Sequence, residues 1–432
     1  MFHRGLHVSR PPALLERALS HARPSKWRAL AMLMMVGLFN YIDRLSLSIL
    51  QVPIAKEFAL SDTQLGALTG LAFSLVYTIA SVPIARIADR YSRKMLIVVA
   101  LLVWTLMTMA CGLATGFVSL LVLRMGVAIG EAGCVPATYS MISDYFPPQQ
   151  RGRAIALYGM VFPLGTLLGF SASGWLGQWL GWRETFFIIG FLGLAVVPLV
   201  STTLAEPTRG LTDGRHVESA PVPFATAVRI LWHTPALKHI VLGVGVLAYP
   251  LNAILVWNAA FYSRTYALAL GEIAFNLAFI SGVAGAAGLY LSGAIADKLG
   301  ASNRKWYLLL PAGASIVLVP FLLWQYHFAA SAHHSFAIAA GTAVLLNSFL
   351  APLTAISQSL VPSNLRAFTS AYVVCSAGFF GTVLGPFCTG YIADTLASHG
   401  VGQESLQYAI LASGVVAICG AGVLIVGSRR LD

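Results

Sequence analysis

The sequence predicts an all-α membrane protein with twelve transmembrane helices in two pseudo-symmetric six-helix bundles. Composition is the first reason: hydrophobic residues make up 57% of the 432 positions, charged residues only 10%, and the mean hydropathy is +0.77. These values are typical of proteins with many membrane spans and exclude a soluble domain. The second reason is order along the chain, because twelve apolar stretches fall six and six on either side of one long polar stretch.

Each apolar stretch is close to the ~20 residues that a helix needs to cross a bilayer. Short polar segments separate the stretches from one another. We expect the twelve spans to be residues 29–54, 64–87, 95–115, 118–143, 152–177, 184–205, 237–262, 271–296, 306–327, 336–361, 367–393 and 404–428.

The polar segments define the rest of the chain. The first residues are basic, are broken by prolines and contain no apolar core, so we expect the first span, rather than a cleaved signal peptide, to target the chain. The long polar stretch carries the turn signals Glu206-Pro207 and Asp213-Gly214, which indicate a linker. The predicted organisation is an N-terminal tail (1–28), a first bundle (29–205), a linker (206–235), a second bundle (236–428) and a short tail (429–432).

Lys and Arg are distributed unequally between the two sides of the predicted protein. With the N-terminus placed inside, all but five of the 27 fall in the tails, the linker, or loops and adjoining span ends on that side. The five are Lys56, Arg183 and Arg264 in outer loops and Arg44 and Arg124 within spans. Because positive charge accumulates on the cytoplasmic side, we expect a multi-pass protein of a bacterial inner membrane with both termini cytoplasmic. The net charge of +11 is otherwise scattered, so we expect no nucleic-acid binding.

Two loops recur at matching places in the two halves. Ala85-x-x-x-Asp89-Arg90-x-x-Arg93-Lys94 follows the second span, and Gly293-x-x-x-Asp297-Lys298 follows the eighth. Pro147-x-x-x-Arg151 follows the fourth span, and Pro362-x-x-x-Arg366 follows the tenth. This repetition predicts a duplicated six-helix unit. Charged loops at the cytoplasmic helix ends can pair across the two halves when these close and separate when they open.

The first of these loops resembles the signature loop of the major facilitator superfamily, and the resemblance covers essentially the whole chain. Within that superfamily, Asn40-Tyr41-Ile42-Asp43-Arg44, Phe73-x-x-x-Tyr77 and Gly130-Glu131-Ala132 resemble the Spinster family. Anion:cation symporters of the same superfamily share the first and third motifs. The resemblance implies the major facilitator fold, with two bundles around a central cavity, and for Spinster transporters a lipid-like substrate. It also implies a cytoplasmic gate, which we assign to Asp89, Arg90, Arg93, Lys94, Asp144, Arg151 and Asp297.

Four ionisable residues lie inside predicted spans, Asp43 and Arg44 in the first and Arg124 and Glu131 in the fourth. An ionised side chain at bilayer depth costs at least ~2.5 kcal/mol, so such residues normally face a protein-lined cavity and serve ion or solute movement. Asp43 and Glu131 both lie about fourteen residues into their helices, hence at similar depth. Arg124 and Glu131 are ~10 Å apart along one helix and poorly placed to pair directly, so Asp43-Arg44 is the expected partner.

A buried carboxylate that changes its arginine partner between two states can bind and release a proton. We therefore predict that Asp43, Arg44, Arg124 and Glu131 couple proton movement to the conformational cycle. The alternative is a permanent salt bridge that only fixes helix packing. The coupling role is favoured because the C-terminal half lacks the set, with Leu346 aligned to Glu131.

The C-terminal half offers polar but uncharged side chains in its spans. Together with residues of the first half they predict a cavity that is charged on one wall and amphipathic on the other, suited to a molecule with an ionic head and an apolar body. Each residue has a simpler alternative as a hydrogen bond between packed helices. The predicted cavity residues are Asn40, Tyr41, Tyr77, Tyr139, Asn252, Trp257, Asn258, Asn347 and Gln358.

The sequence contains no nucleotide-binding loop, zinc motif or nucleophile elbow, and its five cysteines form no CxxC pair. We therefore expect no enzyme activity, no cofactor and no metal site. The predicted function is secondary active transport by alternating access, proton-coupled, of an amphipathic lipid-like substrate such as a lysophospholipid or sphingoid-type molecule, by a monomer. One alternative is a proton-coupled symporter of small organic anions, with Arg44 and Arg124 binding the carboxylate. The other is a ligand sensor without transport.

Overall fold

The computed structural model describes residues 26–209, 229–230, 232–362 and 365–431. In this part of the chain twelve helices are long and apolar enough to cross a membrane, and there is no strand. The predicted all-α membrane fold is therefore confirmed. The predicted N-terminal tail, apart from its last three residues, and most of the predicted linker lie outside the described residues.

The N-terminal half contains the first six spans, and three of them are divided into shorter helices. In chain order the elements are α2 (Lys26–Phe58); α3 (Asp62–Gly66), the π-helical turn η1 (Ala67–Leu71) and α4 (Ala72–Arg90); α5 (Arg93–Cys111); α6 (Phe117–Glu131) and α7 (Cys134–Tyr145); α8 (Pro148–Gly159) and α9 (Val161–Trp179); and α10 (Trp182–Thr203).

The C-terminal half repeats this plan with six further spans. Its elements are α12 (Pro235–Tyr266); α13 (Leu270–Phe279), η2 (Ile280–Ala284) and α14 (Gly285–Gly300); α15 (Trp306–Leu323) and η3 (Trp324–Phe328); α16 (Ala332–Leu346) and α17 (Leu350–Ser359); α18 (Arg366–Ser376), η5 (Ala377–Leu384) and α19 (Gly385–Ser398); and η6 (Gly402–Glu404) with α20 (Ser405–Ser428).

The fourth and tenth spans break at equivalent positions. Helix α6 ends at Glu131 and helix α16 ends at Leu346, the two residues that the sequence repeat aligns. A β-carbon added to Gly133, just after the first break, would lie 2.6 Å from Ile84 Cγ2, so the bend brings α7 close to α4. Pro136 and Pro352 lie in the first turn after the respective breaks, and the first break places Glu131 at a helix end.

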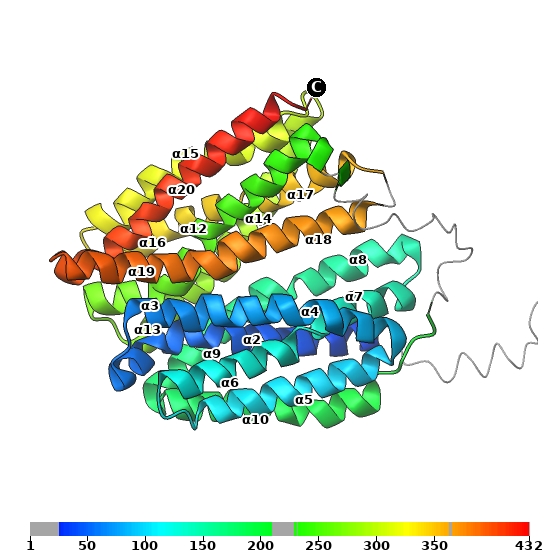
Figure 1. Ribbon diagram of the computed structural model, residues 1–432, viewed down its shortest axis with the longest axis horizontal. Helices are drawn as coiled ribbons and strands as arrows, with labels where there is room; N and C mark the ends of the chain where they lie inside the picture. The colour runs from blue at the N-terminus through cyan, green and yellow to red at the C-terminus, as the bar shows by residue number, and fades with distance from the viewer. Residues whose placement is uncertain (1–25, 210–228, 231, 363–364, 432) are drawn as a thin grey trace, which may run out of the picture.

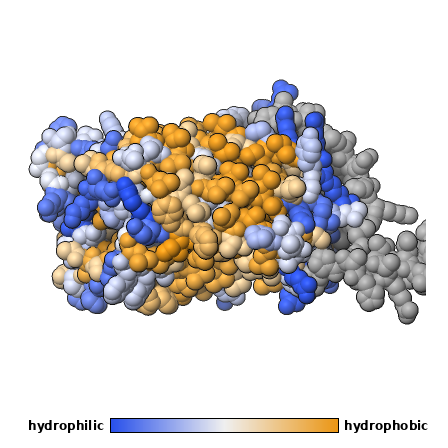
Figure 2. Space-filling model, turned by 90° about the horizontal axis from the view of Figure 1, so that it is seen from below, coloured by the Kyte–Doolittle hydropathy of each residue, from blue (hydrophilic) through white to orange (hydrophobic). Residues whose placement is uncertain are grey.

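Figure 1 shows the two halves as separate groups of helices, α2 to α10 below and α12 to α20 above. We call the end that holds Lys26 and Leu431 the terminal end and the opposite one, which holds the α2–α3 and α12–α13 connections, the distal end. The halves converge toward the distal end, where α3 lies beside α19 and α13 beside α9. Figure 2 shows a broad hydrophobic band around the middle of the molecule with hydrophilic residues toward both ends, as expected for a chain that spans a bilayer.

Small residues allow the close approach at the distal end. A β-carbon added to Gly390 of α19 would lie 2.2 Å from the backbone oxygen of Asp62, and one added to Gly174 of α9 would lie 2.0 Å from Cβ of Ala274. Glycine at such crossings lets two helix backbones come nearer than any side chain would permit. The two halves therefore pack without a gap at this end.

Candidate functional site

The four charged residues predicted to act together form two ion pairs between α2 and the adjoining α6. Arg44 Nη2 lies 3.1 Å from Glu131 Oε2, and Arg124 Nη1 lies 3.5 Å from Asp43 Oδ1. The predicted partnership between Asp43-Arg44 and the fourth span is thus present in the structure. Glu131 is fully buried and Asp43 and Arg124 are 2% exposed, whereas the Arg44 side chain is 27% exposed. Arg44 is therefore the member of the set that a ligand reaches first.

Aromatic rings surround the two guanidinium groups. Arg44 Cζ lies 4.8 Å from the centre of the Phe73 ring, 4.9 Å from Tyr77 and 6.0 Å from Tyr41, and Arg124 Cζ lies 5.2 Å from Phe73. A cation over an aromatic face is stabilised where water is excluded. Two predicted cavity residues, Tyr41 and Tyr77, thus hold Arg44. Phe73 was not among the predicted residues, although its spacing of one helical turn before Tyr77 indicates a shared face.

Several polar atoms of the charged cluster lack a hydrogen-bond partner among the described residues. Thr108 donates its hydroxyl to Asp43 Oδ1 at 2.9 Å, but Asp43 Oδ2, Glu131 Oε1 and the Nε atoms of Arg44 and Arg124 have none. Each such buried atom costs about 1–3 kcal/mol. Buried polar atoms without a partner call for an explanation, and binding of a proton, a water molecule or a ligand is one.

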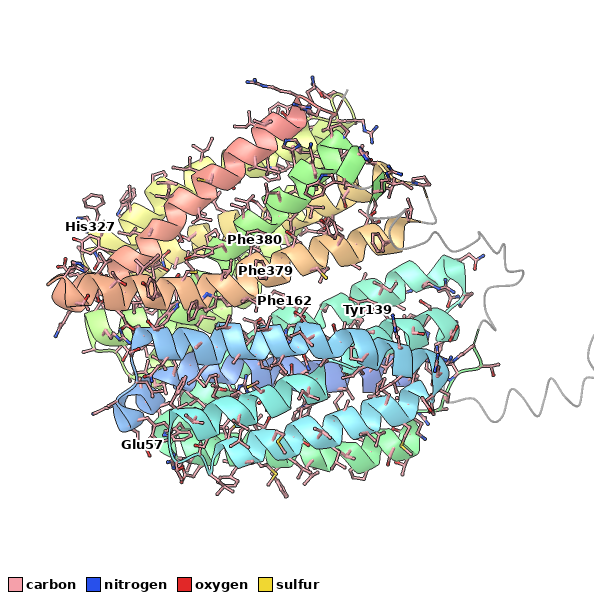
Figure 3. The ribbon with its side chains drawn as sticks, in the orientation of Figure 1. Glu57, Tyr139, Phe162, His327, Phe379 and Phe380 are labelled. Atoms are coloured by element: carbon pink, nitrogen blue, oxygen red, sulfur yellow. The ribbon has the colours of Figure 1, made fainter. Side chains whose placement is uncertain are left out.

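Asn40 lies one turn before the paired residues of α2. It is 3% exposed, and its Nδ2 has no partner among the described residues, so this predicted cavity residue adds a spare donor to the same wall. Tyr139 of α7, another predicted cavity residue, is 40% exposed and packs edge-on against Tyr158. Figure 3 labels Tyr139 and Phe162 on the N-terminal half, along the side that faces the C-terminal half.

A pocket lies in the C-terminal half next to α9. It has about 480 Å³ of empty volume, counting the part open to solvent, and two predicted cavity residues, Asn258 and Asn347, line it. Its lining residues are Phe162, Thr166, Leu251, Ile254, Leu255, Asn258, Ile280, Ser281, Gln325, Ala339, Thr342, Ala343, Leu346 and Asn347. Sequence reasoning missed Gln325 in the ninth span, from which no cavity residue was predicted, and Thr342 in the tenth.

Three predicted cavity residues of the C-terminal half do not line this pocket. Trp257 is fully buried, and its indole N–H donates to the backbone oxygen of Pro386 at 2.9 Å, so it packs α12 against α19. Gln358 donates to the Ser370 hydroxyl at 3.1 Å, and Asn252 donates to the Ala248 backbone oxygen of its own helix. Trp257 and Gln358 therefore make the bonds between packed helices that were the alternative, whereas Asn252 bonds within its own helix.

The predicted gate residues at the terminal end make contacts within their own halves. Arg93 forms an ion pair with Asp144, and its Nε lies 2.9 Å from Glu206 Oε1. Arg151 donates to the Ser143 backbone oxygen, and Asp297 accepts from the Tyr307 hydroxyl. Arg90 is exposed, Lys94 donates its backbone N–H to Glu206, and the Asp89 side chain lies outside the described residues.

Glu206 joins the start of α5 to the end of the N-terminal half. Burial opposes its ionisation, but hydrogen bonds from the Lys94 backbone and from the Arg93 and Ser92 side chains outweigh this effect and hold the pKa of Glu206 below its usual value. Its Oε2 accepts from the Lys94 backbone N–H at 2.7 Å and from the Ser92 hydroxyl at 2.8 Å. A carboxylate at a helix N-terminus also interacts favourably with the helix dipole.

Charged contacts between the halves gather at the distal end, where none was predicted. Both oxygens of Asp62 pair with Arg264, at 2.5 and 2.8 Å. Asp394 accepts from the backbone N–H groups of Asp62 and Thr63, at 3.0 and 2.8 Å, and from the Thr63 hydroxyl. We call Asp62, Thr63, Arg264 and Asp394 the distal latch. It joins α3 of one half to α12 and α19 of the other.

Comparison with known proteins agrees with this architecture. A sequence profile described as Major Facilitator Superfamily matches residues 33–386. An MFS-type efflux pump of Mycolicibacterium smegmatis is 30% identical over 94% of this chain and 93% of its own. A hexuronate transporter of Bacillus subtilis is 26% identical over 84% of this chain and 86% of its own. A probable sphingolipid transporter, spinster homolog 1, of Arabidopsis thaliana is 26% identical over 84% of this chain and 80% of its own.

A solved structure is also similar over nearly the whole length. It is a bacterial homologue of the human lysosomal transporter Spinster in an inward-facing, unoccupied conformation, with a TM-score of 0.86 and 26% identity over 95% of this chain and 98% of that one. The family and the fold are those of transporters rather than enzymes. The chain therefore belongs to the major facilitator superfamily, and within it resembles the Spinster proteins.

Proposed function

We propose that this major facilitator transporter is proton-coupled and moves an amphipathic, lipid-like anion, of the lysophospholipid or sphingoid type, across a bacterial inner membrane by alternating access. The observation that carries the proposal is the two intramembrane ion pairs, Arg44–Glu131 and Arg124–Asp43, which among the described residues have no counterpart in the C-terminal half. The proposal includes cytoplasmic termini, which the positive charge at the terminal end supports.

Exchange of partners at Arg44 is the proposed coupling step. Arg44 is the exposed member of the cluster, and the ionised Glu131 depends on it because a buried carboxylate without a partner is strongly destabilised. When the anionic head of a substrate pairs with Arg44, Glu131 loses that partner and takes up a proton. The proton and the anion are therefore bound together, and neither is bound well alone.

The surroundings of the cluster support a substrate with an apolar body. The Tyr41 ring lies against Arg44, and its centre is 5.3 Å from the centre of the Phe162 ring. Phe162 in turn lines the largely aliphatic pocket of the C-terminal half. A substrate with its ionic head at Arg44 and its apolar body directed toward this pocket would contact both the charged and the amphipathic wall of the predicted cavity. The similarity to a probable sphingolipid transporter is in keeping with such a substrate.

The gate residues are proposed to act in the opposite conformation. We assign the structure, in which the distal latch is closed, to a carrier open at its terminal end; the inward-facing conformation of the similar solved structure supports this assignment. Opening the distal end brings the terminal ends of the halves together, and Asp89, Arg90, Arg93, Lys94, Asp144, Arg151 and Asp297 then come to lie between them.

The experiment that tests the proposal is proton flux into proteoliposomes that contain a pH-sensitive dye. Lysophospholipids and small carboxylates are added in turn to wild type, Glu131→Gln and Glu57→Gln. Lysophospholipid should trigger flux in wild type and in Glu57→Gln, because Glu57 pairs with Arg183 in a half-exposed bridge at the distal end. Glu131→Gln should bind the lipid but carry no flux.

Two other results are informative. Loss of folding in Glu131→Gln, seen as loss of a monodisperse chromatographic peak, would favour a purely structural salt bridge. Flux with small carboxylates alone would favour the second candidate, a symporter of small organic anions. The two intramembrane arginines, Arg124 buried and Arg44 partly exposed, and the similarity to a hexuronate transporter support this candidate.

A further inference from the structure

Gln325, which lines the pocket of the C-terminal half, has a buried polar atom without a hydrogen-bond partner in the described part of the chain. Gln325 is fully buried, and its Oε1 has no hydrogen bond among the described residues. Its Nε2 points to the Tyr262 hydroxyl at 3.5 Å, and its backbone oxygen accepts from Ser335. The side chain is thus held from one side while its acceptor oxygen is left over. A buried acceptor without a partner is costly, and an observed one calls for an explanation.

The neighbouring polar side chain is also held in place by a tyrosine. Asn258 Oδ1 accepts from the Tyr326 hydroxyl at 2.5 Å, which orients the amide and leaves its Nδ2 for the pocket. Tyr326 and Tyr262 are both nearly fully buried, so the two amides are fixed by rigid side chains. A site built on supported side chains is better organised for binding than one on free rotamers.

The rest of the lining excludes a charged ligand group. No lining residue is ionisable at neutral pH, and five of them are Leu or Ile. A charge would therefore enter this pocket without a partner, at a cost of several kcal/mol. An uncharged group that can donate one hydrogen bond would satisfy Gln325 Oε1 without that cost.

The distance between the charged cluster and the pocket along the membrane normal can be derived from a hydrogen bond between the two halves. Gln51 of α2 donates to the Val256 backbone oxygen of α12 at 2.6 Å, so these residues lie at the same depth, and both helices run toward the distal end. Arg44 lies seven residues before Gln51, and Asn258 lies two residues after Val256. At ~1.5 Å per residue, the pocket amide is about 14 Å beyond Arg44 along the membrane normal.

We propose that this pocket binds a hydroxyl group on the apolar body of the substrate, about 14 Å further along the membrane normal than its anionic head, with the hydroxyl donating to Gln325 Oε1. This inference rests on the proposed function, since it assigns the head to Arg44. The preferred substrates are then amphiphiles with a hydroxylated chain rather than plain acyl chains.

The experiment compares two ligands that differ in one hydroxyl, stearoyl lysophosphatidate and 12-hydroxystearoyl lysophosphatidate, by titration calorimetry on purified protein in nanodiscs. Wild type should bind the hydroxylated lipid about tenfold more tightly, as expected for one hydrogen bond to an otherwise unpaired acceptor. Gln325→Met, of similar size but with no acceptor, should bind both lipids equally. The matched control Gln358→Met should keep the preference, because Gln358 is outside the pocket.

The outcomes separate the two proposals. Equal affinity of wild type for the two lipids would overturn the hydroxyl site and leave the lipid-transport proposal intact. Failure of wild type to bind either lipid would overturn both. If Gln325→Met does not fold, Gln325→Asn is compared with wild type instead. This variant keeps the amide but places its oxygen one methylene further from the bound hydroxyl. A preference retained at full strength in that variant would also overturn the hydroxyl site.

Discussion

The Arg124–Asp43 pair is almost completely buried, so its two members depend on each other. Removal of one partner of a buried ion pair costs about 3–5 kcal/mol, because the remaining charge stays buried without compensation. We expect Arg124→Met to lower the apparent melting temperature of the purified protein strongly. The double variant Arg124→Met/Asp43→Asn should recover a large part of the loss, since it leaves no unpaired charge.

The matched control is Arg183→Met. Arg183 Nη2 lies 2.8 Å from Glu57 Oε1, but both side chains are partly exposed, and such bridges contribute about 0–1 kcal/mol. Its melting temperature should stay close to that of wild type. Equal effects of Arg124→Met and Arg183→Met would mean that the intramembrane pair is no stronger than a surface bridge.

Individual residues differ in how far the sequence predicts them. The Asp43-Arg44 partnership with the fourth span follows from helical rise alone, which fixes the depth of charged residues in lipid-spanning helices. The role of Trp257 does not follow from the sequence. A tryptophan whose indole N–H bonds to a backbone oxygen and a tryptophan that faces a cavity cannot be distinguished by sequence. Gln325 was missed because its importance lies in an unsatisfied oxygen, a property of the folded state only.

Glu206 connects two elements, the start of α5 and the segment that follows α10. Its folded-state pKa lies below the ordinary value of ~4.3. Its contribution to stability is therefore present above that value and is lost as the pH falls through the lower folded-state pKa. We expect Glu206→Gln to melt at a lower temperature than wild type at pH 7, with the difference shrinking as the pH is lowered below about 4.3.

Lys94→Ala is the control for this pH dependence. Lys94 contributes its backbone N–H to Glu206, and alanine keeps that donor. The variant should therefore follow the wild-type pH profile. A difference between wild type and Glu206→Gln that is constant from neutral to acidic pH would contradict the assigned hydrogen bonds.

Whole elements are more predictable than their interruptions. All twelve spans follow from apolar length, because a bilayer demands about 20 apolar residues per crossing. The exact positions of the breaks after Glu131 and Leu346 do not, because the prolines that indicate a bend, Pro136 and Pro352, lie several residues further on, and a proline also occurs inside the unbroken α10. Their equivalence becomes visible only when the repeat is combined with the structure.

The distal latch was not predictable for a similar reason. Asp62, Arg264 and Asp394 lie hundreds of positions apart in the chain, and each resembles an ordinary charge near a helix end. Only the packing of α3 against α19 brings them together. Charges that stabilise one conformation of a carrier carry no local signal, because their partners are set by how the halves meet.

The latch makes a prediction about the molecule as a whole. Arg264→Met removes both bonds to Asp62 across the halves and should shift the population toward conformations open at the distal end. The shift is measured by double electron–electron resonance, which gives the distance between spin labels at positions 56 and 327 in a background without the five native cysteines. Figure 3 shows Glu57 and His327 on different halves at the same end, so labels at 56 and 327 report its opening.

Arg183→Met is again the matched control, because its bond to Glu57 lies within one half at the same end. It should leave the distance distribution unchanged. An unchanged distribution in Arg264→Met as well would show that close packing at Gly174 and Gly390, rather than the ion pair, keeps the distal end shut.

The pairing of the buried ions also has an electrical consequence. Two carboxylates and two guanidiniums sum to zero, so the unloaded cluster carries no net charge through the membrane field. A proton that arrives without an anion would add one positive charge, whose movement across 100 mV changes the energy by about 2.3 kcal/mol. A carrier loaded with one proton and one monovalent anion is neutral again. Under the proposed coupling, the contribution of this cluster makes only the half-loaded carrier sensitive to transmembrane voltage, and adds no voltage dependence to the reorientation of the empty and the fully loaded forms.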